Sequence, residues 1–177
     1  MNAFDELDKV LNQDPDAFDY EELAAIYSNI YEQFDDSDIS ALRLSWRNRS
    51  AHWLSHFADS LSSLPHPLDP DFTLRAFSPV AWEMIYSDSD NTILVGLRLL
   101  LATNEGYERR GRNYYFTTNI QLDDKQLSDL AEIWKSRHSL RDSIKQFCVQ
   151  AGYAGRMRRT LKLERWSDAT TKYPIFA

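Results

Sequence analysis

Apolar side chains recur at helical spacing through the N-terminal part of the chain. After Asp19 they stand one, three or four residues apart, at Leu23, Ile26, Tyr27, Ile30, Tyr31 and Phe34. This spacing predicts an amphipathic helix, and Asp19 followed by Glu22 three residues later is typical of a capping box that starts one. Similar stripes predict a first helix over residues 3–12 and a long third helix that ends near Ser63. We therefore expect three N-terminal helices.

A proline-rich stretch marks the main internal boundary. Residues 64–70 contain three prolines, a spacing that no helix survives. Beyond this stretch, apolar residues occupy alternate positions in 93–101 and, most regularly, aromatic and apolar residues do so in 113–122. Alternation with a period of two is typical of a half-buried antiparallel strand. The pattern therefore changes from helical to extended at this boundary.

We interpret residues 72–122 as a central antiparallel sheet. Residues 81–86 supply a short strand candidate, and turn-forming residues separate it from the next strand. The main alternative is a helix over residues 92–102, because three consecutive leucines followed by alanine also suit a helix. The basic segment Arg156–Arg165 has leucines in alternation and is interpreted as a further edge strand, which gives a sheet of three to four strands.

Helical spacing returns after the sheet. Asp123 or Asp124 caps one predicted helix, and Gly152 stands where a second helix would end in a left-handed residue. Together these patterns predict a single α+β domain over residues 1–177. It comprises three helices in an acidic part over 1–63, the antiparallel sheet over 72–122, and two C-terminal helices with a basic tail over 123–177.

The composition is that of a packed globule. Hydrophobic residues make up 43% of the 177 residues and aromatic residues 13%. The single cysteine, Cys148, excludes an internal disulfide and a cysteine-based zinc cluster. The N-terminus lacks a secretory signal pattern, and the longest apolar run, Ile93–Ala102, spans half a bilayer and contains Arg98. We expect a cytoplasmic protein that does not enter the membrane.

Acidic residues are concentrated at the N-terminal end. The formal net charge is −7, but residues 1–100 hold 18 acids and 6 bases, whereas residues 101–177 hold 9 acids and 14 bases. Within residues 1–38 there are 12 acids and a single base, Lys9. This end is either a solvated face that keeps the protein soluble or a surface for a basic partner, and it would repel nucleic acid.

Partner binding is the function that we favour from these features. The candidate binding residues are the acids before and at the start of the second predicted helix: Asp14, Asp16, Asp19, Glu21 and Glu22. Carboxylates steer a basic partner, and the abundant Tyr and Trp are residue types that anchor interfaces. The hypothesis is a non-catalytic module of the immunity or inhibitor, antitoxin-like, secretion-chaperone or phage host-targeting type. Exposed aromatic residues would serve a homodimer equally well.

Two arginine clusters support an alternative, nucleic-acid binding. They are Arg109, Arg110 and Arg112, expected in a loop between two strands, and Arg156, Arg158 and Arg159 after the last predicted helix. Guanidinium groups bind phosphates, and neighbouring aromatic rings stack on bases. The simpler interpretations are a charged loop tip that confers solubility and a basic segment that packs against the acidic N-terminal helices of its own chain.

Other chemistry has weaker support in the sequence. His52, His56 and Asp59 share one helical face at a spacing that metal sites use, although exposed polar residues are the simpler interpretation. Arg98 would line a polar sheet face with Tyr115, where a ligand or substrate fits, or would pair with a carboxylate. No phosphate loop or nucleophile elbow occurs. Catalysis therefore stays open but unsupported, and we expect no cofactor.

Overall fold

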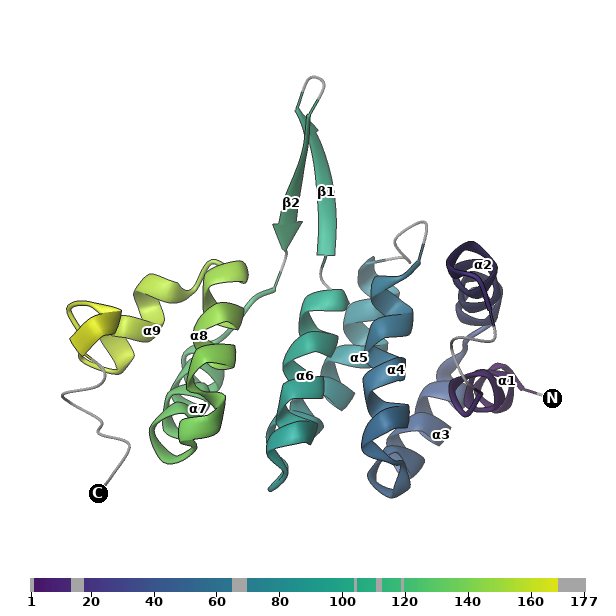
Figure 1. Ribbon diagram of the computed structural model, residues 1–177, viewed down its shortest axis with the longest axis horizontal. Coiled ribbons are helices and arrows are strands. Elements are labelled where there is room, and N and C mark those ends of the chain that lie inside the picture. The colour runs from purple at the N-terminus through teal and green to yellow at the C-terminus, as the bar shows by residue number, and fades with distance from the viewer. Residues whose placement is uncertain are drawn as a thin grey trace. The chain divides into compact units, whose positions relative to one another are not determined.

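The protein is predominantly helical. The computed structural model describes residues 2–13, 18–64, 70–103, 105–110, 113–118 and 120–168, with the backbone alone for 70, 71, 73, 74 and both strands. This part of the chain holds nine α-helices and two short strands. The predicted α+β fold with a central antiparallel sheet of three to four strands is therefore wrong. The two strands, β1 (Glu105–Arg110) and β2 (Asn113–Thr118), pair only with each other (Figure 1).

The chain divides into two compact units, Met1–Gly106 and Tyr107–Ala177. The single domain expected over residues 1–177 stays a prediction. The helices of the first unit are α1 (Ala3–Leu11), α2 (Tyr20–Tyr31), α3 (Asp36–Ser45), α4 (Ala51–Ser62), α5 (Pro70–Ile85) and α6 (Asp90–Ala102), with a 3-10 turn over Trp46–Asn48. None of the helices in the described residues combines the length and the apolar character that a membrane crossing requires.

Helix α6 replaces the strand expected over residues 93–101. Ser89 caps the helix by accepting a hydrogen bond from the amide of Thr92. Its buried residues are Ile93, Val95, Gly96, Leu97, Leu99 and Leu100, which include both odd and even positions. Because α6 packs against both α4 and α5, it is apolar over most of its circumference. The alternating leucines therefore reflect burial on several sides of a helix. The helical alternative for residues 92–102 was the better interpretation.

Helix α5 replaces the strand expected over residues 81–86. Its buried residues form pairs four positions apart: Ala76 and Phe77, Val80 and Ala81, Met84 and Ile85. This is a helical stripe that faces the core of the first unit. The helix tolerates Pro79 in its interior, where sequence rules place a break.

The long third helix expected up to Ser63 is two helices. After the 3-10 turn, Arg49 is extended at φ −90° and ψ 151°, and Ser50 starts α4 by accepting a hydrogen bond from the amide of Trp53 at 3.1 Å. A serine at this position satisfies an amide that a continuous helix would bond internally. The break lets α3 and α4 take different directions within the first unit.

Aromatic rings form the centre of the first unit. Phe77 of α5 contacts Tyr31, Phe34 and Phe57, with ring centroids 5.8, 6.1 and 5.9 Å away. Tyr31 is buried and its hydroxyl lies 2.5 Å from Ser60 Oγ, which itself donates to the carbonyl of Phe57. Tyr31 is therefore the donor to Ser60. Burial raises the pKa of Tyr31 far above its ordinary value, so this hydroxyl stays protonated.

A buried carboxylate joins two helix starts. Asp38, 2% exposed, accepts the amide of Phe4 in α1 at 2.9 Å. Its other oxygen accepts the amide of Asp35, completing the capping box of α3. The Asp38 carboxylate thus satisfies amides at the N-terminal ends of both helices, where negative charge is favoured. This acid of the N-terminal end is structural and is not available to a partner.

The second unit contains the remaining helices. They are α7 (Asp124–Ser136), α8 (Arg141–Gln150) and α9 (Ala154–Thr160), with 3-10 turns over His138–Leu140 and Trp166–Asp168. Asp123 caps α7 in a capping box with Gln126, and Gly152 adopts φ +77° after α8, as predicted. The edge strand expected over Arg156–Arg165 is wrong, because this segment forms α9 and then turns at Lys162, whose φ is 54°.

Candidate partner-binding surface

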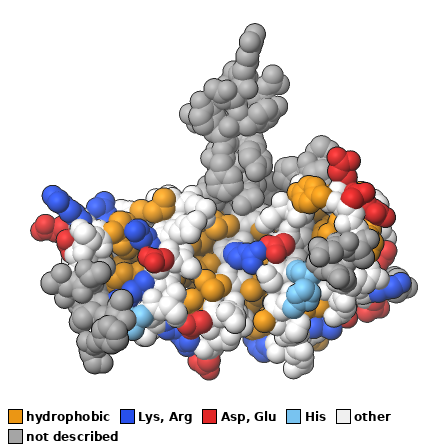
Figure 2. Space-filling model, in the orientation of Figure 1, with side chains coloured by type: hydrophobic (Ala, Val, Ile, Leu, Met, Phe, Trp, Pro, Cys, Tyr) orange, Lys and Arg blue, Asp and Glu red, His pale blue; other side chains and the backbone are white. Residues whose placement is uncertain are grey.

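The acidic end of the chain forms an exposed surface on the first three helices. Figure 2 shows acidic side chains gathered over α2. The exposed acids in the described residues of this region are Asp5, Glu6, Asp19, Glu21, Glu22, Glu32, Asp35 and Asp36. Asp14 and Asp16 lie outside the described residues. The remaining acids, Asp8 and Asp38, are turned to structural contacts. The surface therefore carries most of the negative charge that the sequence placed in this region.

Asp19 caps a helix, whereas the side chains of Glu21 and Glu22 have no structural contact among the described residues. The Asp19 carboxylate accepts the amide of Glu22 at 2.8 Å and caps the start of α2. The side chains of Glu21 and Glu22 are exposed, and no hydrogen bond or ion pair holds either one among the described residues. These two carboxylates favour the helix start through the helix dipole, yet they remain accessible to another molecule.

An exposed tyrosine stands between these acids. Tyr20, the first residue of α2, is 70% exposed. It precedes Leu23 by three residues, so the hydrophobic pattern alone would extend the buried stripe to include it. Tyr20 is exposed because it lies in the first turn of α2, before the part of the helix that packs against the core. An accessible aromatic ring beside carboxylates offers both contact area and charge to a partner.

Four arginines of the first unit form ion pairs with other acids. Arg49 pairs with Asp8 at 3.0 Å and lies over the rings of Phe4 and Trp53. Arg98 hydrogen-bonds Ser55 at 3.0 Å and pairs with Asp59 on α4. Arg43 and Arg47 both bind Glu83 of α5. Within the described residues, these ion pairs leave the charge of Glu21 and Glu22 uncompensated.

The candidate metal triad is not assembled. His52 and His56 lie together on α4, with ring centroids 3.8 Å apart, but Asp59 is engaged by Arg98. No group of three or more His, Cys, Asp or Glu side chains in the described part of the chain has the geometry to hold a metal ion. The spacing in the sequence was correct for one helical face, yet the third residue serves an interhelical ion pair.

The proposed polar sheet face around Arg98 does not exist. Arg98 lies on α6, which is a helix, and its guanidinium contacts α4. Tyr115 is in β2, whose side chains lie outside the described residues. The ligand site built on this face is therefore wrong, and pairing of Arg98 with a carboxylate was the correct interpretation. Cys148 is buried, which raises the pKa of its thiol to about 12 and keeps it protonated near neutral pH.

The first arginine cluster is placed only in part. Arg109 and Arg110 belong to β1 rather than to a loop, and their side chains lie outside the described residues, as does all of Arg112. In the second cluster, Arg158 donates to the carbonyl of Glu164 at 2.9 Å, whereas Arg159 is exposed on α9. A basic surface shared by the two clusters therefore stays a prediction.

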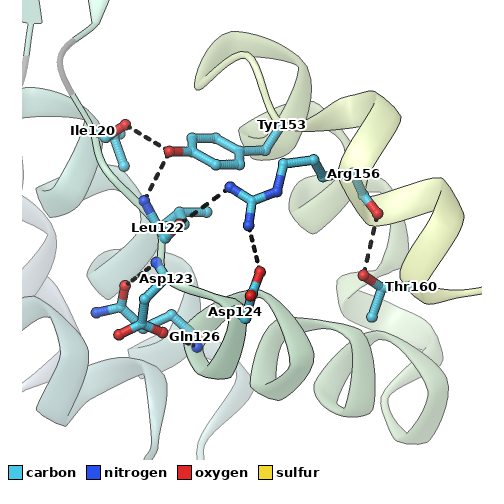
Figure 3. Close-up of polar contacts among 8 residues, drawn as sticks. All are labelled: Ile120, Leu122, Asp123, Asp124, Gln126, Tyr153, Arg156 and Thr160. Carbon is cyan, nitrogen blue, oxygen red and sulfur yellow. Dashed lines mark hydrogen bonds and ion pairs between the residues drawn. The ribbon is translucent and has the colours of Figure 1, made fainter.

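Arg156 and Tyr153 hold the segment before α7 (Figure 3). The Tyr153 hydroxyl accepts the amide of Leu122 at 2.9 Å and donates to the carbonyl of Ile120 at 3.3 Å. Arg156 lies over the Tyr153 ring at 5.3 Å, donates to the carbonyl of Leu122 at 3.4 Å and pairs with Asp124 at 2.5 Å. Arg156 is thus committed to its own unit through Asp124, and packing of this cluster against the acidic N-terminal helices stays a prediction.

We expect Tyr153→Phe to loosen this segment. The change removes one hydroxyl and leaves the Leu122 amide and the Ile120 carbonyl without their partner, which costs about 1–2 kcal/mol. Urea denaturation measures the loss, and hydrogen exchange at the Leu122 amide should become faster. Tyr20→Phe is the matched control, since that hydroxyl is exposed, and should change neither quantity. Unchanged exchange at Leu122 would contradict the role assigned to Tyr153.

Comparison with protein-family models, with curated proteins and with solved structures found no significant match to this chain.

Proposed function

We propose that this chain is a non-catalytic protein-binding module whose acidic surface docks a basic protein partner. The observation that carries the proposal is the start of α2, where Tyr20 is 70% exposed and is followed by two carboxylates without a compensating base. Interfaces are anchored by aromatic residues, and charges around them select and steer the partner. A partner with a lysine- or arginine-rich surface supplies the missing counter-charge.

The distribution of charge between the two units supports the same conclusion. The first unit contains 19 acids and 6 bases, a net charge of −13, and the second contains 8 acids and 14 bases, a net charge of +6. The bases of the second unit include Arg156, Arg158 and Lys125, which bind acceptors within that unit. A field of one sign over the first unit raises the rate at which an oppositely charged protein associates.

The module type stays as proposed from the sequence: an immunity or inhibitor protein, an antitoxin-like neutraliser, a secretion chaperone or a phage protein that targets a host factor. These classes share one mechanism, in which a compact acidic protein covers a basic working surface of another. Nucleic-acid binding ranks lower because Arg156 and Arg158 already have acceptors within their own unit. An acidic first unit would also repel phosphates.

Affinity purification with matched variants tests the proposal. The tagged chain, its E21Q/E22Q variant and the control D142N/E164Q are used as bait in an extract of the native cells, with and without nuclease treatment. Both variants lose two exposed carboxylates, from the first and the second unit respectively. Asp19 is left intact because it caps α2. We expect one basic protein to be retained by wild type and control and reduced about tenfold with E21Q/E22Q.

Three outcomes separate the hypotheses. Loss of the same protein at high salt and with E21Q/E22Q supports docking through α2. Equal retention by all three baits contradicts it, and so does recovery of the bait alone. Nucleic acid that co-purifies without nuclease, and disappears with it, would favour the arginine clusters over the acidic surface.

A further inference from the structure

A second surface of the first unit combines an exposed leucine with two arginines. Leu44 of α3 is 81% exposed. Arg43 precedes Leu44 in α3, and Arg47 follows in the 3-10 turn over Trp46–Asn48. The arginine side chains are 50% and 58% exposed. We call Arg43, Leu44 and Arg47 the Leu44 face.

The arginines of the Leu44 face are held in place by one carboxylate. Arg43 donates to Glu83 Oε1 from Nε at 3.1 Å and from a terminal nitrogen at 2.6 Å. Arg47 donates to Glu83 Oε2 at 3.2 Å and lies over the Trp46 ring at 4.5 Å. Trp46 Nε1 also donates to Oε2, at 3.2 Å. Long side chains that are fixed in this way lose less entropy when they bind.

The charge of this group remains positive. Partial burial would by itself raise the pKa of Glu83, but hydrogen bonds from Arg43 and Trp46 hold it below its ordinary value. Glu83 is therefore ionised near neutral pH. Arg43, Arg47 and Glu83 together carry a net charge of one positive unit. Each guanidinium has five N–H donors, and Glu83 takes two from Arg43 and one from Arg47. The remaining donors are available to a carboxylate beside an exposed leucine.

The first unit itself carries the complementary surface. Tyr20 is exposed beside Glu21 and Glu22, so an aromatic ring with negative charge matches a leucine with positive charge. In a two-fold dimer such a pair of surfaces is used twice, because each copy presents both. We propose that a second copy of this chain covers the Leu44 face, with the start of its α2 against Arg43 and Arg47. The dimer and partner docking both use the start of α2, so a basic partner would compete with the dimer for this surface.

Sedimentation of the purified full-length chain tests the dimer without any partner. We expect concentration-dependent dimers at low salt that dissociate as salt is added, since both contacts are charged. Each charge-reversal variant, R43E/R47E and E21K/E22K, is expected to be monomeric. An equimolar mixture of the two is expected to restore a dimer, because one matched pair of surfaces forms again.

Leu44→Ser provides a variant that leaves the Glu83 ion pairs intact. It is expected to weaken the dimer about tenfold. Leu44 is exposed in the monomer and would be buried in the dimer, and serine would remove this apolar contact. Val149→Ser is the control, because Val149 is also exposed, at 55%, but belongs to the second unit. A wild-type chain that stays monomeric at low salt overturns the proposal. A dimer dissociation constant that is the same in L44S as in wild type, or a charge-reversed mixture that remains monomeric, overturns it as well.

Discussion

Phe77→Ala is expected to lower the free energy of unfolding by about 4 kcal/mol, the largest effect of any single truncation considered for this chain. Phe77 is fully buried and its ring meets those of Tyr31, Phe34, Phe57 and Phe72. Truncation removes apolar contact with all four rings and leaves a cavity that helices on several sides cannot close. A loss of this size is a large part of the stability of a small domain.

Urea denaturation followed by circular dichroism measures this effect. Phe77→Leu should cost less than Phe77→Ala, because leucine fills part of the space. Tyr20→Ala is the matched control for loss of an aromatic ring and should shift stability by about 0.5 kcal/mol or less, as Tyr20 is 70% exposed. Equal losses at the two positions would show that Phe77 is not the centre of the core. The control also establishes whether Tyr20 is free to serve as a binding residue.

Gly96→Ala is expected to destabilise the protein by about 2 kcal/mol, although alanine is the better helix former. A Cβ at residue 96 would lie 2.7 Å from the carbonyl oxygen of Ala81, 2.9 Å from Ile85 Cγ1 and 3.0 Å from Met84 Cβ. The first contact is with backbone, so α5 and α6 would have to move apart. This overpacking exceeds the gain of about 1 kcal/mol from helix propensity.

Gly155→Ala is the control of opposite sign. Gly155 lies in α9, and an added Cβ would have its nearest neighbour, Arg159, at 3.8 Å, an ordinary contact. The same substitution should therefore stabilise the chain by about 0.5 kcal/mol. Thermal or urea unfolding of both variants measures the difference. A stabilising Gly96→Ala would contradict the close packing of α5 on α6.

The helix starts were predictable because their signals are local. Asp19 and Asp123 each accept an amide three residues later, and Gly152 adopts the left-handed conformation that its position indicated. Such features depend on a few neighbouring residues and require no knowledge of the tertiary fold. The stripe of α2 was likewise visible, because this helix buries one side and exposes the other.

The sheet was predicted wrongly because tertiary packing decided the outcome. Helix α6 is buried on several sides, so its leucines show no clean helical period and their alternation favoured a strand. Helix α5 contains Pro79, which sequence rules count against a helix. In both cases the contact between α5 and α6, including the close approach at Gly96, determines the secondary structure.

The candidate surface was predictable in its charge but not in its detail. The sequence located the acids and predicted that Asp19 caps a helix, yet it gave no sign that the side chains of Glu21 and Glu22 remain unpaired. Exposure of Tyr20 contradicts its hydrophobic spacing. The pairing of Arg98 with Asp59, and of Arg43 and Arg47 with Glu83, joins residues about 40 positions apart, which no local pattern reveals.

The association rate of the recovered partner, measured as a function of salt, tests the central claim most directly. Wild type and the control D142N/E164Q should associate more slowly as salt rises from about 50 to about 200 mM, because screening removes the steering by α2. The E21Q/E22Q variant should associate more slowly at low salt and show a shallower dependence. Equal rates and equal salt dependence for all three proteins would contradict docking through the acidic surface.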